Sequence, residues 1–436
     1  MKHYKFYIYV LVVIALAGCK PELDSYEPSA GNADFSKYVA LGNSLTAGYK
    51  DGALSLSGQK VSYPNIIAQQ LKLVGGGEFT QPLMYDDAGF GGRLILGLQE
   101  VKDCMGQPVP GASPTLGPIP YGVDPDPRNM LSSQELFEST NLGVPGAKSF
   151  HLLFPGYGML NPYFKRFASS DTASIISQAV SLNPTFFSLW IGNNDVLQYA
   201  IAGGEAVSLT SPPFFEMAYS MLIDKLTKFG AKGVIANIPD IDKIAFFTTF
   251  PYNALKLTDQ TQVDQLNAAY APLGISFSLG ANPLIVADPS AIGGVRQIKS
   301  TELVLLSLPQ DSIVCAQWGS AKPIDEKFYL SDQELSDIRE TIKQYNLIIK
   351  NIADAKGLAL VDANSFFKNA VTGFVYDGAK FNASYITGGI NSIDGVHLTP
   401  RGNALVANAF IEAINLKYNS RIPLVDVTDY LGLIFP

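Results

Sequence analysis

The sequence predicts an α/β fold, a three-layer α/β/α sandwich in which a central parallel sheet lies between two layers of helices. Short apolar runs alternate along the chain with longer segments whose apolar residues recur at helical spacing. This alternation is typical of a parallel sheet covered on both faces. Two of the apolar runs end at a glycine, as strands do before a turn. The 436 residues, 47% of them hydrophobic, are enough for one decorated domain or for about two to three smaller ones.

Four apolar runs are predicted to be strands of the sheet, because buried parallel strands are nearly continuous runs of apolar residues. The runs are Tyr38–Leu41, Thr185–Ile191, Gly233–Ile238 and Gly357–Val361. The first ends at Gly42 and the second at Gly192. Functional sites in such sheets form beyond the carboxyl ends of the strands, so these two glycines mark the edge where we expect one.

The predicted helices lie between and after these runs. Tyr63–Val74 has apolar residues at helical spacing, and Pro64 is tolerated in the first turn of a helix. A second helix, at about 213–229, precedes the third strand, and a third is expected near Ser331–Lys350. Arg401–Leu416 closes the domain, with apolar residues at i, i+3, i+4 and i+7.

Two long regions interrupt this alternation within the domain, which we place at residues 37–416 with a C-terminal extension at 417–436. Residues 86–139 are rich in glycine and proline, and residues 241–351 mix aromatic residues with strand-like runs. Long loops in compact domains are usually functional or disordered. We interpret both regions as insertions that roof the strand ends, and a separate domain is the alternative for the second.

The N-terminus has the pattern of an export signal. Two early lysines precede an apolar run from Phe6 to Ala17, which is shorter than the about 20 residues that span a bilayer. Its end, Leu16-Ala17-Gly18-Cys19, resembles the lipobox of bacterial lipoproteins. We therefore expect a signal peptide at 1–18, a lipidated Cys19 and a flexible tether at 19–36. Lys20 after the cysteine favours the outer membrane by the same resemblance. An ordinary signal peptide, with Cys19 incidental, is the alternative.

Charge and composition exclude some classes of function. Removal of residues 1–18 takes away two lysines and no acidic residue, so the formal charge changes from −8 to −10. An acidic chain without a basic cluster argues against nucleic acid as a partner. Two dispersed cysteines, Cys104 and Cys315, and two histidines form no ligand cluster, so we expect no metal or cofactor. Export would expose both cysteines to an oxidising space, and the sequence leaves open whether they pair.

The strongest chemical signal is Asp394-Gly395-Val396-His397. His397 is one of two histidines that remain after residue 18, and histidine is suited to taking and returning protons near neutral pH. An aspartate three residues earlier can hold an imidazole in one tautomer. The other histidine, His151, is expected on a helix surface or loop and not as a second base.

Three further blocks complete a constellation. Ser44 follows the first strand within Gly42-Asn43-Ser44-Leu45, and a serine that caps a helix is the alternative interpretation. Gly146 lies in a glycine-rich turn, and Asn194 lies in Gly-Asn-Asn-Asp after the second strand. Each block alone is an ordinary turn. Together they place a serine, a glycine, an asparagine and an aspartate–histidine pair at expected strand ends.

These blocks resemble those of SGNH hydrolases of the GDSL esterase/lipase family, over roughly residues 37–84, 141–240 and 357–416. The resemblance implies a flavodoxin-like fold, with Ser44 as nucleophile, His397 as general base and Asp394 orienting the imidazole. It also implies an oxyanion hole formed by the N–H groups of Ser44 and Gly146 and the amide of Asn194. The sequence departs from the family at Asn43, where an aspartate is usual.

The expected function is therefore that of a lipid-anchored serine esterase of the cell envelope, periplasmic or surface-exposed, that cleaves carboxylic esters. Aromatic residues at 151–167 and 245–252 can hold an acyl chain or stack on sugars, or can belong to the core. They favour acyl-chain or aryl esters slightly over O-acetyl groups on glycans. The alternatives are a catalytically silent lipoprotein that binds glycan or lipid, and an acyltransferase on the same scaffold.

Overall fold

The computed structural model describes residues 27–436, so the predicted signal peptide and Cys19 lie outside the described residues. Its centre is a five-stranded sheet with the order β13-β6-β5-β1-β4, and all neighbouring strands are parallel. The strands are β1 (Tyr38–Gly42), β4 (Asn141–Gly143), β5 (Phe186–Trp190), β6 (Lys232–Ala236) and β13 (Ala359–Val361). The four predicted strands are confirmed. The fifth, β4, lies directly before the glycine-rich turn that contains Gly146, where we predicted no strand.

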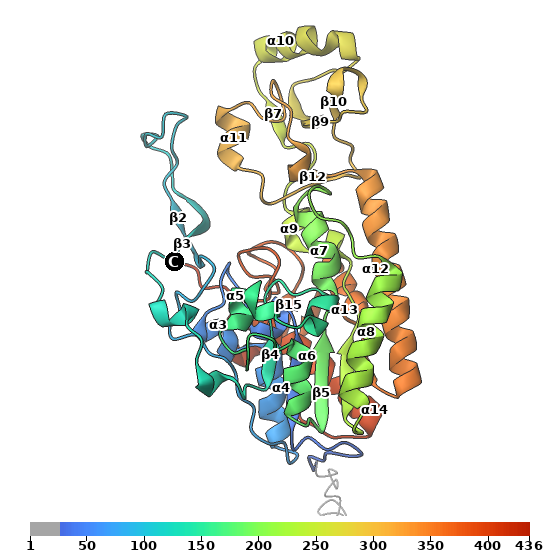
Figure 1. Cartoon of the computed structure of the whole chain (residues 1–436). Coiled ribbons are helices and arrows are strands. Elements are labelled where there is room, and N and C mark those ends of the chain that lie inside the picture. The colour runs from blue at the N-terminus through green and yellow to red at the C-terminus, as the bar shows by residue number, and fades with distance from the viewer. Residues whose placement is uncertain (1–26) are drawn as a thin grey trace, which may run out of the picture.

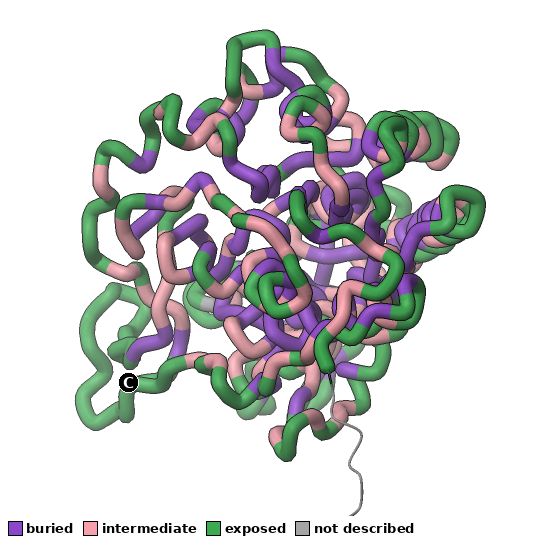
Figure 2. Tube along the Cα trace, turned by 90° about the horizontal axis from the view of Figure 1, so that it is seen from below, coloured by how far each residue is buried: buried purple, intermediate pink, exposed green. Residues whose placement is uncertain are grey.

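Helices cover both faces of the sheet (Figure 1). Alternate residues of a strand point to opposite faces, and the two apolar cores follow that rule. Val39 and Leu41 belong to one core, whereas Tyr38 and Ala40 belong to the other. The first core includes residues of α6 (Ile175–Ser181), α8 (Pro212–Thr227) and α12 (Asp332–Lys356). The second includes residues of α4 (Tyr63–Lys72), α13 (Ala363–Thr372) and α14 (Pro400–Tyr418). The three-layer sandwich is confirmed, and Figure 2 shows its buried interior in purple.

The remaining elements are short and lie mostly around the carboxyl edge of the sheet. The helices are α2 (Ser44–Ala47), α3 (Leu56–Lys60), α5 (Pro162–Lys165), α7 (Asn193–Ile201), α9 (Ala245–Thr248), α10 (Gln260–Tyr270) and α11 (Gln310–Cys315). The antiparallel pairs are β2 (Leu94–Gln99) with β3 (Thr115–Pro120), β7 (Leu255–Leu257) with β8 (Gly280–Asn282), β9 (Ile285–Ala287) with β10 (Val295–Gln297), β11 (Leu303–Val304) with β12 (Tyr329–Leu330), and β14 (Phe374–Tyr376) with β15 (Ala379–Phe381).

Single turns of 3-10 helix connect many of these elements. They are η1 (Pro127–Met130), η2 (Gln134–Leu136), η3 (Ser149–Leu153), η4 (Tyr157–Met159), η5 (Ile241–Lys243), η6 (Ala271–Leu273), η7 (Ile292–Gly294), η8 (Glu326–Phe328) and η9 (Val427–Asp429). Among the helices within residues 27–436, none combines the length and the apolar character needed to cross a bilayer.

The two irregular regions rise beyond the carboxyl ends of the strands (Figure 1). The first contains the β2–β3 hairpin. The second has an apolar cluster of its own, built from residues between Leu255 and Tyr329. The helix that follows, α12, buries residues such as Ile338 and Ile342 in the first core of the sandwich. The predicted insertion at 241–351 was therefore too long at its C-terminal end, because an amphipathic helix gives no sign of which surface it covers.

Both ends of the described chain pack against α14. Ser29 forms a backbone bridge with Arg421, and the N–H of Asn32 donates to the carbonyl of Tyr418. Phe35 is almost completely buried. Residues 29–36 are therefore not a flexible tether, because backbone hydrogen bonds fix them. Ile422 and Val427 of the C-terminal extension are buried in the second core.

Candidate active site

A sharp turn at the end of β1 presents Ser44. Gly42 ends the strand and α2 begins at Ser44, with Asn43 between them. The side-chain oxygen of Asn43 accepts a hydrogen bond from the N–H of Leu45, 3.0 Å away, and so caps the helix. A Cβ on Gly42 would lie 2.1 Å from Thr46 Oγ1 and 2.5 Å from the carbonyl oxygen of Trp190. Only glycine allows the chain to turn this tightly beside β5.

Ser44, His397 and Asp394 form one hydrogen-bonded chain. His397 Nε2 lies 2.9 Å from Ser44 Oγ, and His397 Nδ1 lies 2.9 Å from Asp394 Oδ2. The other carboxylate oxygen of Asp394 accepts hydrogen bonds from the backbone N–H groups of Val396, at 2.9 Å, and His397, at 2.8 Å. The structure thus brings together three residues that lie up to 353 positions apart. A hydroxyl hydrogen-bonded to an imidazole in this way can be deprotonated as it attacks an electrophile.

The environment keeps Asp394 ionised. Burial by itself would raise the pKa of its carboxyl group, but the positive charge that His397 can carry and the hydrogen bonds from His397 and Val396 outweigh burial and hold the pKa well below its usual range. The backbone N–H of Gly52 donates a further hydrogen bond to Asp394, at 3.0 Å. The ring of Tyr49 packs against the imidazole of His397, with ring centres 4.6 Å apart. The carboxylate and the ring that it orients are therefore held from several sides.

Asn194 lines the same cavity as Ser44 and His397, and it is hydrogen-bonded to the turn that contains Gly146. Gly146 has a φ of +79° in the turn after β4, a conformation that favours glycine. Asn194, in the first turn of α7, donates from Nδ2 to the carbonyl of Ala147 at 2.9 Å. A carboxamide nitrogen carries two hydrogens, so a second N–H of Asn194 can serve another acceptor. Asp195 fixes the two segments to each other, because its carboxylate accepts hydrogen bonds from the N–H and the hydroxyl of Ser149.

Ser44, Asn194 and His397 line one small apolar cavity of about 30 Å³. Its apolar walls come from Leu45, Trp190, Leu197, Ile238, Pro239, Ile241, Ile244, Phe367 and Val396. A cavity needs about 10–15 Å³ of such space to hold one water molecule, so this one has room for a small group. The arrangement combines a hydroxyl nucleophile, a base, an amide donor and a small apolar recess.

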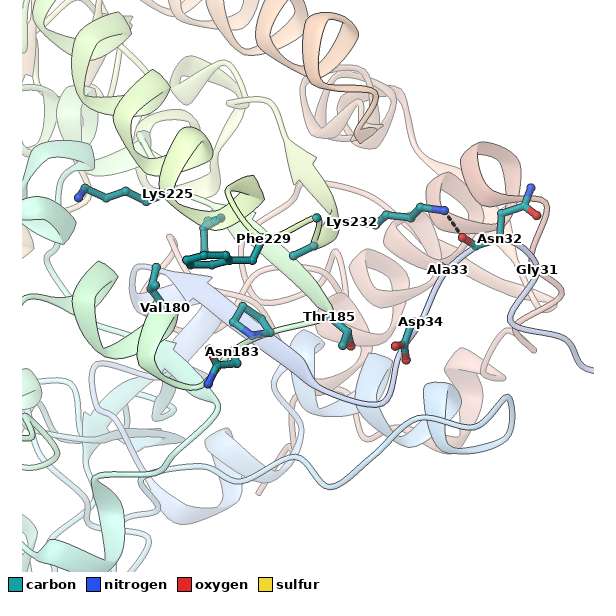
Figure 3. Close-up of a pocket in the computed structure, with 14 residues that line it drawn as sticks. Gly31, Asn32, Ala33, Asp34, Val180, Asn183, Thr185, Lys225, Phe229 and Lys232 are labelled. Atoms are coloured by element: carbon teal, nitrogen blue, oxygen red, sulfur yellow. Dashed lines mark hydrogen bonds between the residues drawn. The ribbon is translucent and has the colours of Figure 1, made fainter.

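A larger cavity, of about 620 Å³, lies at the opposite end of the sheet (Figure 3). Residues 31–34, Thr185, Lys225, Phe229 and Lys232 are among those that line it. None of the predicted site residues lies there, and the cavity is next to the starts of β5 and β6. Its size therefore does not identify it as the reaction site.

His151 lies in η3 and does not line the cavity beside Ser44. Its Nδ1 accepts a hydrogen bond from the N–H of Lys148 at 3.1 Å, and its ring stacks on Tyr157. Burial, together with the positive charge of Lys148, lowers the pKa of His151 to about 4. The imidazole is therefore neutral at pH 7, and its hydrogen bond and its stacking contact indicate a structural role.

Some residues of the site were not predicted from the sequence. Gly52 and Tyr49 support the aspartate and the histidine, and they come from the loop after α2. The segment around Ile241 and Ile244 lines the cavity from the start of the second irregular region. Among the supporting residues, only Asp195 could have been found from the sequence, because it is the last residue of the Gly-Asn-Asn-Asp block that contains Asn194.

The structure joins Cys104 and Cys315 by a disulfide, with Cα atoms 5.1 Å apart, so it answers the pairing question that the sequence left open. Cys19 lies outside the described residues. Within residues 27–436, no group of three or more histidine, cysteine, aspartate or glutamate side chains is arranged to hold a metal ion.

Comparisons with known proteins identify the family to which the chain is similar. The family model described as GDSL-like Lipase/Acylhydrolase matches residues 38–410. Among solved structures, an acetyl xylan esterase variant from Geobacillus stearothermophilus is 12% identical, with a TM-score of 0.38 over 90% of this chain and 98% of that chain. A putative GDSL-like lipase from Parabacteroides merdae is also 12% identical, with a TM-score of 0.37 over 89% and 100% of the two chains. A search of curated protein sequences found no match.

Proposed function

Because this chain belongs to the GDSL-like lipase/acylhydrolase family and is an ester hydrolase, we propose that it cleaves short-chain carboxylic esters through Ser44, His397 and Asp394. The observation that carries the proposal is the continuous hydrogen-bonded chain from Ser44 Oγ through both ring nitrogens of His397 to Asp394 Oδ2. A catalytically silent binding protein would have no use for this arrangement.

The proposed reaction has two steps. As Ser44 Oγ attacks the ester carbonyl carbon, His397 Nε2 takes the hydroxyl proton, and the C–O bond to the alcohol then breaks as the same proton passes to the leaving oxygen. Water next attacks the acyl carbon while His397 Nε2 takes one of its protons. The bond from that carbon to Ser44 Oγ then breaks, His397 returns the proton to Ser44 Oγ, and the acid leaves. Asp394 stays ionised throughout and stabilises the imidazolium that forms in each step.

The negative charge that develops on the carbonyl oxygen requires donors that are already in place. The backbone N–H groups of Ser44 and Gly146 and the second N–H of Asn194 are the proposed donors. Asn194 is held by its bond to Ala147, and Asp195 and Ser149 tie its helix to the turn that contains Gly146. Donors fixed in advance need no reorganisation as the charge forms, which is why they lower the barrier.

The acyl group is proposed to be acetyl or similarly short. The cavity beside Ser44 is small, about 30 Å³, and has apolar walls, which favours a methyl or similarly short group over a long chain. The slight preference for acyl-chain esters that the aromatic segments suggested therefore shifts to short acyl esters, including O-acetyl groups. Phe164 and Phe167 of the first aromatic segment, and Phe247 of the second, are buried core residues.

Hydrolysis of p-nitrophenyl acetate by the purified protein tests this proposal. Ser44→Ala and His397→Ala should each lower kcat by about 10⁴-fold or more at pH 7, since the triad acts as a unit. His151→Ala is the matched control, because it removes the other described histidine without touching the triad, and it should keep near-normal turnover. Equal turnover by Ser44→Ala and the wild type would end the assignment of the nucleophile.

We also propose that Cys19 carries a lipid that anchors the protein to the outer membrane, on the strength of the Leu16-Ala17-Gly18-Cys19 motif. The described chain begins at the end of the sheet opposite Ser44, where residues 31–34 line the cavity of Figure 3 with Lys225 and Lys232. An anchor at Cys19 would then hold the domain with its catalytic edge facing away from that membrane.

Metabolic labelling with a palmitate analogue tests the anchor. The wild-type protein should carry the label and sediment with the outer-membrane fraction, whereas Cys19→Ser should do neither. A labelled Cys19→Ser protein would exclude this cysteine as the site of lipidation.

A further inference from the structure

The β2–β3 hairpin is attached directly beside the catalytic aspartate. The N–H of Leu94, the first residue of β2, donates to the carbonyl of Asp51 at 2.7 Å. Gly52, which follows Asp51 in the chain, donates its N–H to Asp394 Oδ2 at 3.0 Å. The base of the first insertion is therefore two hydrogen bonds away from the triad.

The second insertion is attached on the other side of the same turn. The N–H of Phe246 donates to the carbonyl of Gly395 at 2.9 Å, and the N–H of Leu306 donates to the carbonyl of Phe246 at 3.0 Å. The side chain of Leu306 also packs closely against Gly395. Thus the Asp394–Gly395 turn lies between the bases of the two insertions.

The far ends of the two insertions are joined by the Cys104–Cys315 disulfide. Cys104 lies ten residues after Leu94 in the loop between β2 and β3, and Cys315, the last residue of α11, lies nine residues after Leu306. The two segments rise on the side of the sheet where the strands end (Figure 1). The two segments are therefore joined at their bases through the Asp394–Gly395 turn and at their far ends by the disulfide. Together these parts form a closed ring, which we call the bridge.

The covalent bond is what holds the far ends of the bridge together. Met105 and Val314, each next to one of the cysteines, leave 85% and 77% of their surface exposed, so they do not pack into a shared core. Among the hydrogen bonds of residues 27–436, none joins residues 94–120 to residues 246–330. Both cysteines are exposed, so reductants can reach the bond. Without it, the two segments could separate.

We propose that the bridge limits the size of the alcohol part of the substrate. This inference rests on the esterase function proposed above. In the proposed reaction the small cavity beside Ser44 takes the acyl group, so the alcohol part extends out of it at the carboxyl edge of the sheet, where both insertions rise (Figure 1). A small or slender alcohol fits beside the fixed bridge, whereas a wide, branched polymer collides with it. The preferred substrates are therefore short acyl esters of small alcohols or of slender chain ends, and opening the ring extends the range to bulky polymers.

The test compares a small ester with a bulky one before and after the bridge is opened. The substrates are p-nitrophenyl acetate and chemically acetylated dextran, a branched polysaccharide, and the bridge is opened in the Cys104→Ser/Cys315→Ser double variant. Its kcat/KM for p-nitrophenyl acetate should stay within about twofold of the wild type. Its kcat/KM for acetylated dextran should rise by about fivefold or more.

Two controls keep the result interpretable. The wild-type protein treated with dithiothreitol should show the same gain on acetylated dextran and lose it after reoxidation, which separates the bridge from any folding defect of the variant. An unchanged or lower rate on acetylated dextran, or an equal change on both substrates, would overturn the inference. The failure of the esterase proposal looks different, because the wild type would then not hydrolyse p-nitrophenyl acetate through Ser44 at all.

Discussion

Replacement of Asn194 by alanine tests the proposed oxyanion hole at its side-chain donor. Asn194 is 6% exposed and lines the cavity with Ser44 and His397. Loss of one donor of this kind typically raises the barrier by about 2.7–4 kcal/mol, which corresponds to a fall in kcat of about 10²- to 10³-fold. KM should change little, because the charge that the donor stabilises is present mainly in the transition state. Steady-state hydrolysis of p-nitrophenyl acetate at pH 7 measures both constants.

The same substitution also has a structural cost that must be measured separately. The carbonyl of Ala147 loses its 2.9 Å hydrogen bond from Asn194, and a buried group left without a partner destabilises a protein by about 1–3 kcal/mol. Proteins are usually stable by about 5–15 kcal/mol, so the variant should remain folded. Urea unfolding, followed by circular dichroism, gives this stability change independently of the rate.

Gln198→Ala is the matched control, since Gln198 lies one turn further along α7 and supports the same turn. Its Nε2 donates to the carbonyl of Gly146 at 3.0 Å, and it does not line the cavity. If Asn194 only supports the turn, both variants should lose similar activity. If it is an oxyanion donor, Gln198→Ala should lose less than about threefold. A kcat for Asn194→Ala within about threefold of the wild type would refute the assignment.

Three further predictions follow from the same site. Asp394→Asn should lower kcat by about 10²- to 10⁴-fold at pH 7, because the amide favours the wrong imidazole tautomer, and a fall of less than about tenfold would contradict the role of Asp394. His151 has a folded-state pKa of about 4, lowered mainly by burial, against 6.5 in a free peptide; the unfolded chain therefore binds more protons between those pH values, and stability falls as the pH drops through them. His151→Gln should flatten this decline in a series of melting temperatures, and an unchanged slope would contradict it. Ile244→Ala should widen the acyl cavity and raise the ratio of hexanoate to acetate hydrolysis by about tenfold, whereas an unchanged ratio would show that Ile244 does not limit chain length.

The sequence predicted the sandwich well because its strands bury both faces. Every residue of β1 and β5 is buried, and such strands are apolar runs that a sequence reveals. β4 has only three residues, one of them Asn141. The side chain of Asn141 is buried because its nitrogen donates hydrogen bonds to the carbonyl of Thr46 and to the side-chain oxygen of Gln81. Such partners come from other segments, so no local pattern could identify this strand.

The same distinction applies to the site. The blocks that contain Ser44, Asn194 and Asp394 are local in sequence and were visible as motifs. The support from Gly52 and Tyr49 depends on the return of a loop to a turn more than 340 residues later in the chain. The disulfide joins cysteines separated by 211 positions, and no spacing rule could predict their approach. Contacts between distant segments therefore had to come from the structure.

Asn43 is the position where this chain departs from the family resemblance, and the structure explains why the change is compatible with a reactive Ser44. The oxygen of Asn43 caps α2, a role that an aspartate oxygen would perform equally well. Its nitrogen donates to the side-chain oxygen of Asn193 at 3.3 Å, which an aspartate could not do. Asparagine at position 43 therefore adds a hydrogen-bond donor toward Asn193 of α7, while the cap of α2 that presents Ser44 is kept. A neutral side chain here also adds no negative charge beside Ser44, where the proposed reaction would place a negatively charged carbonyl oxygen.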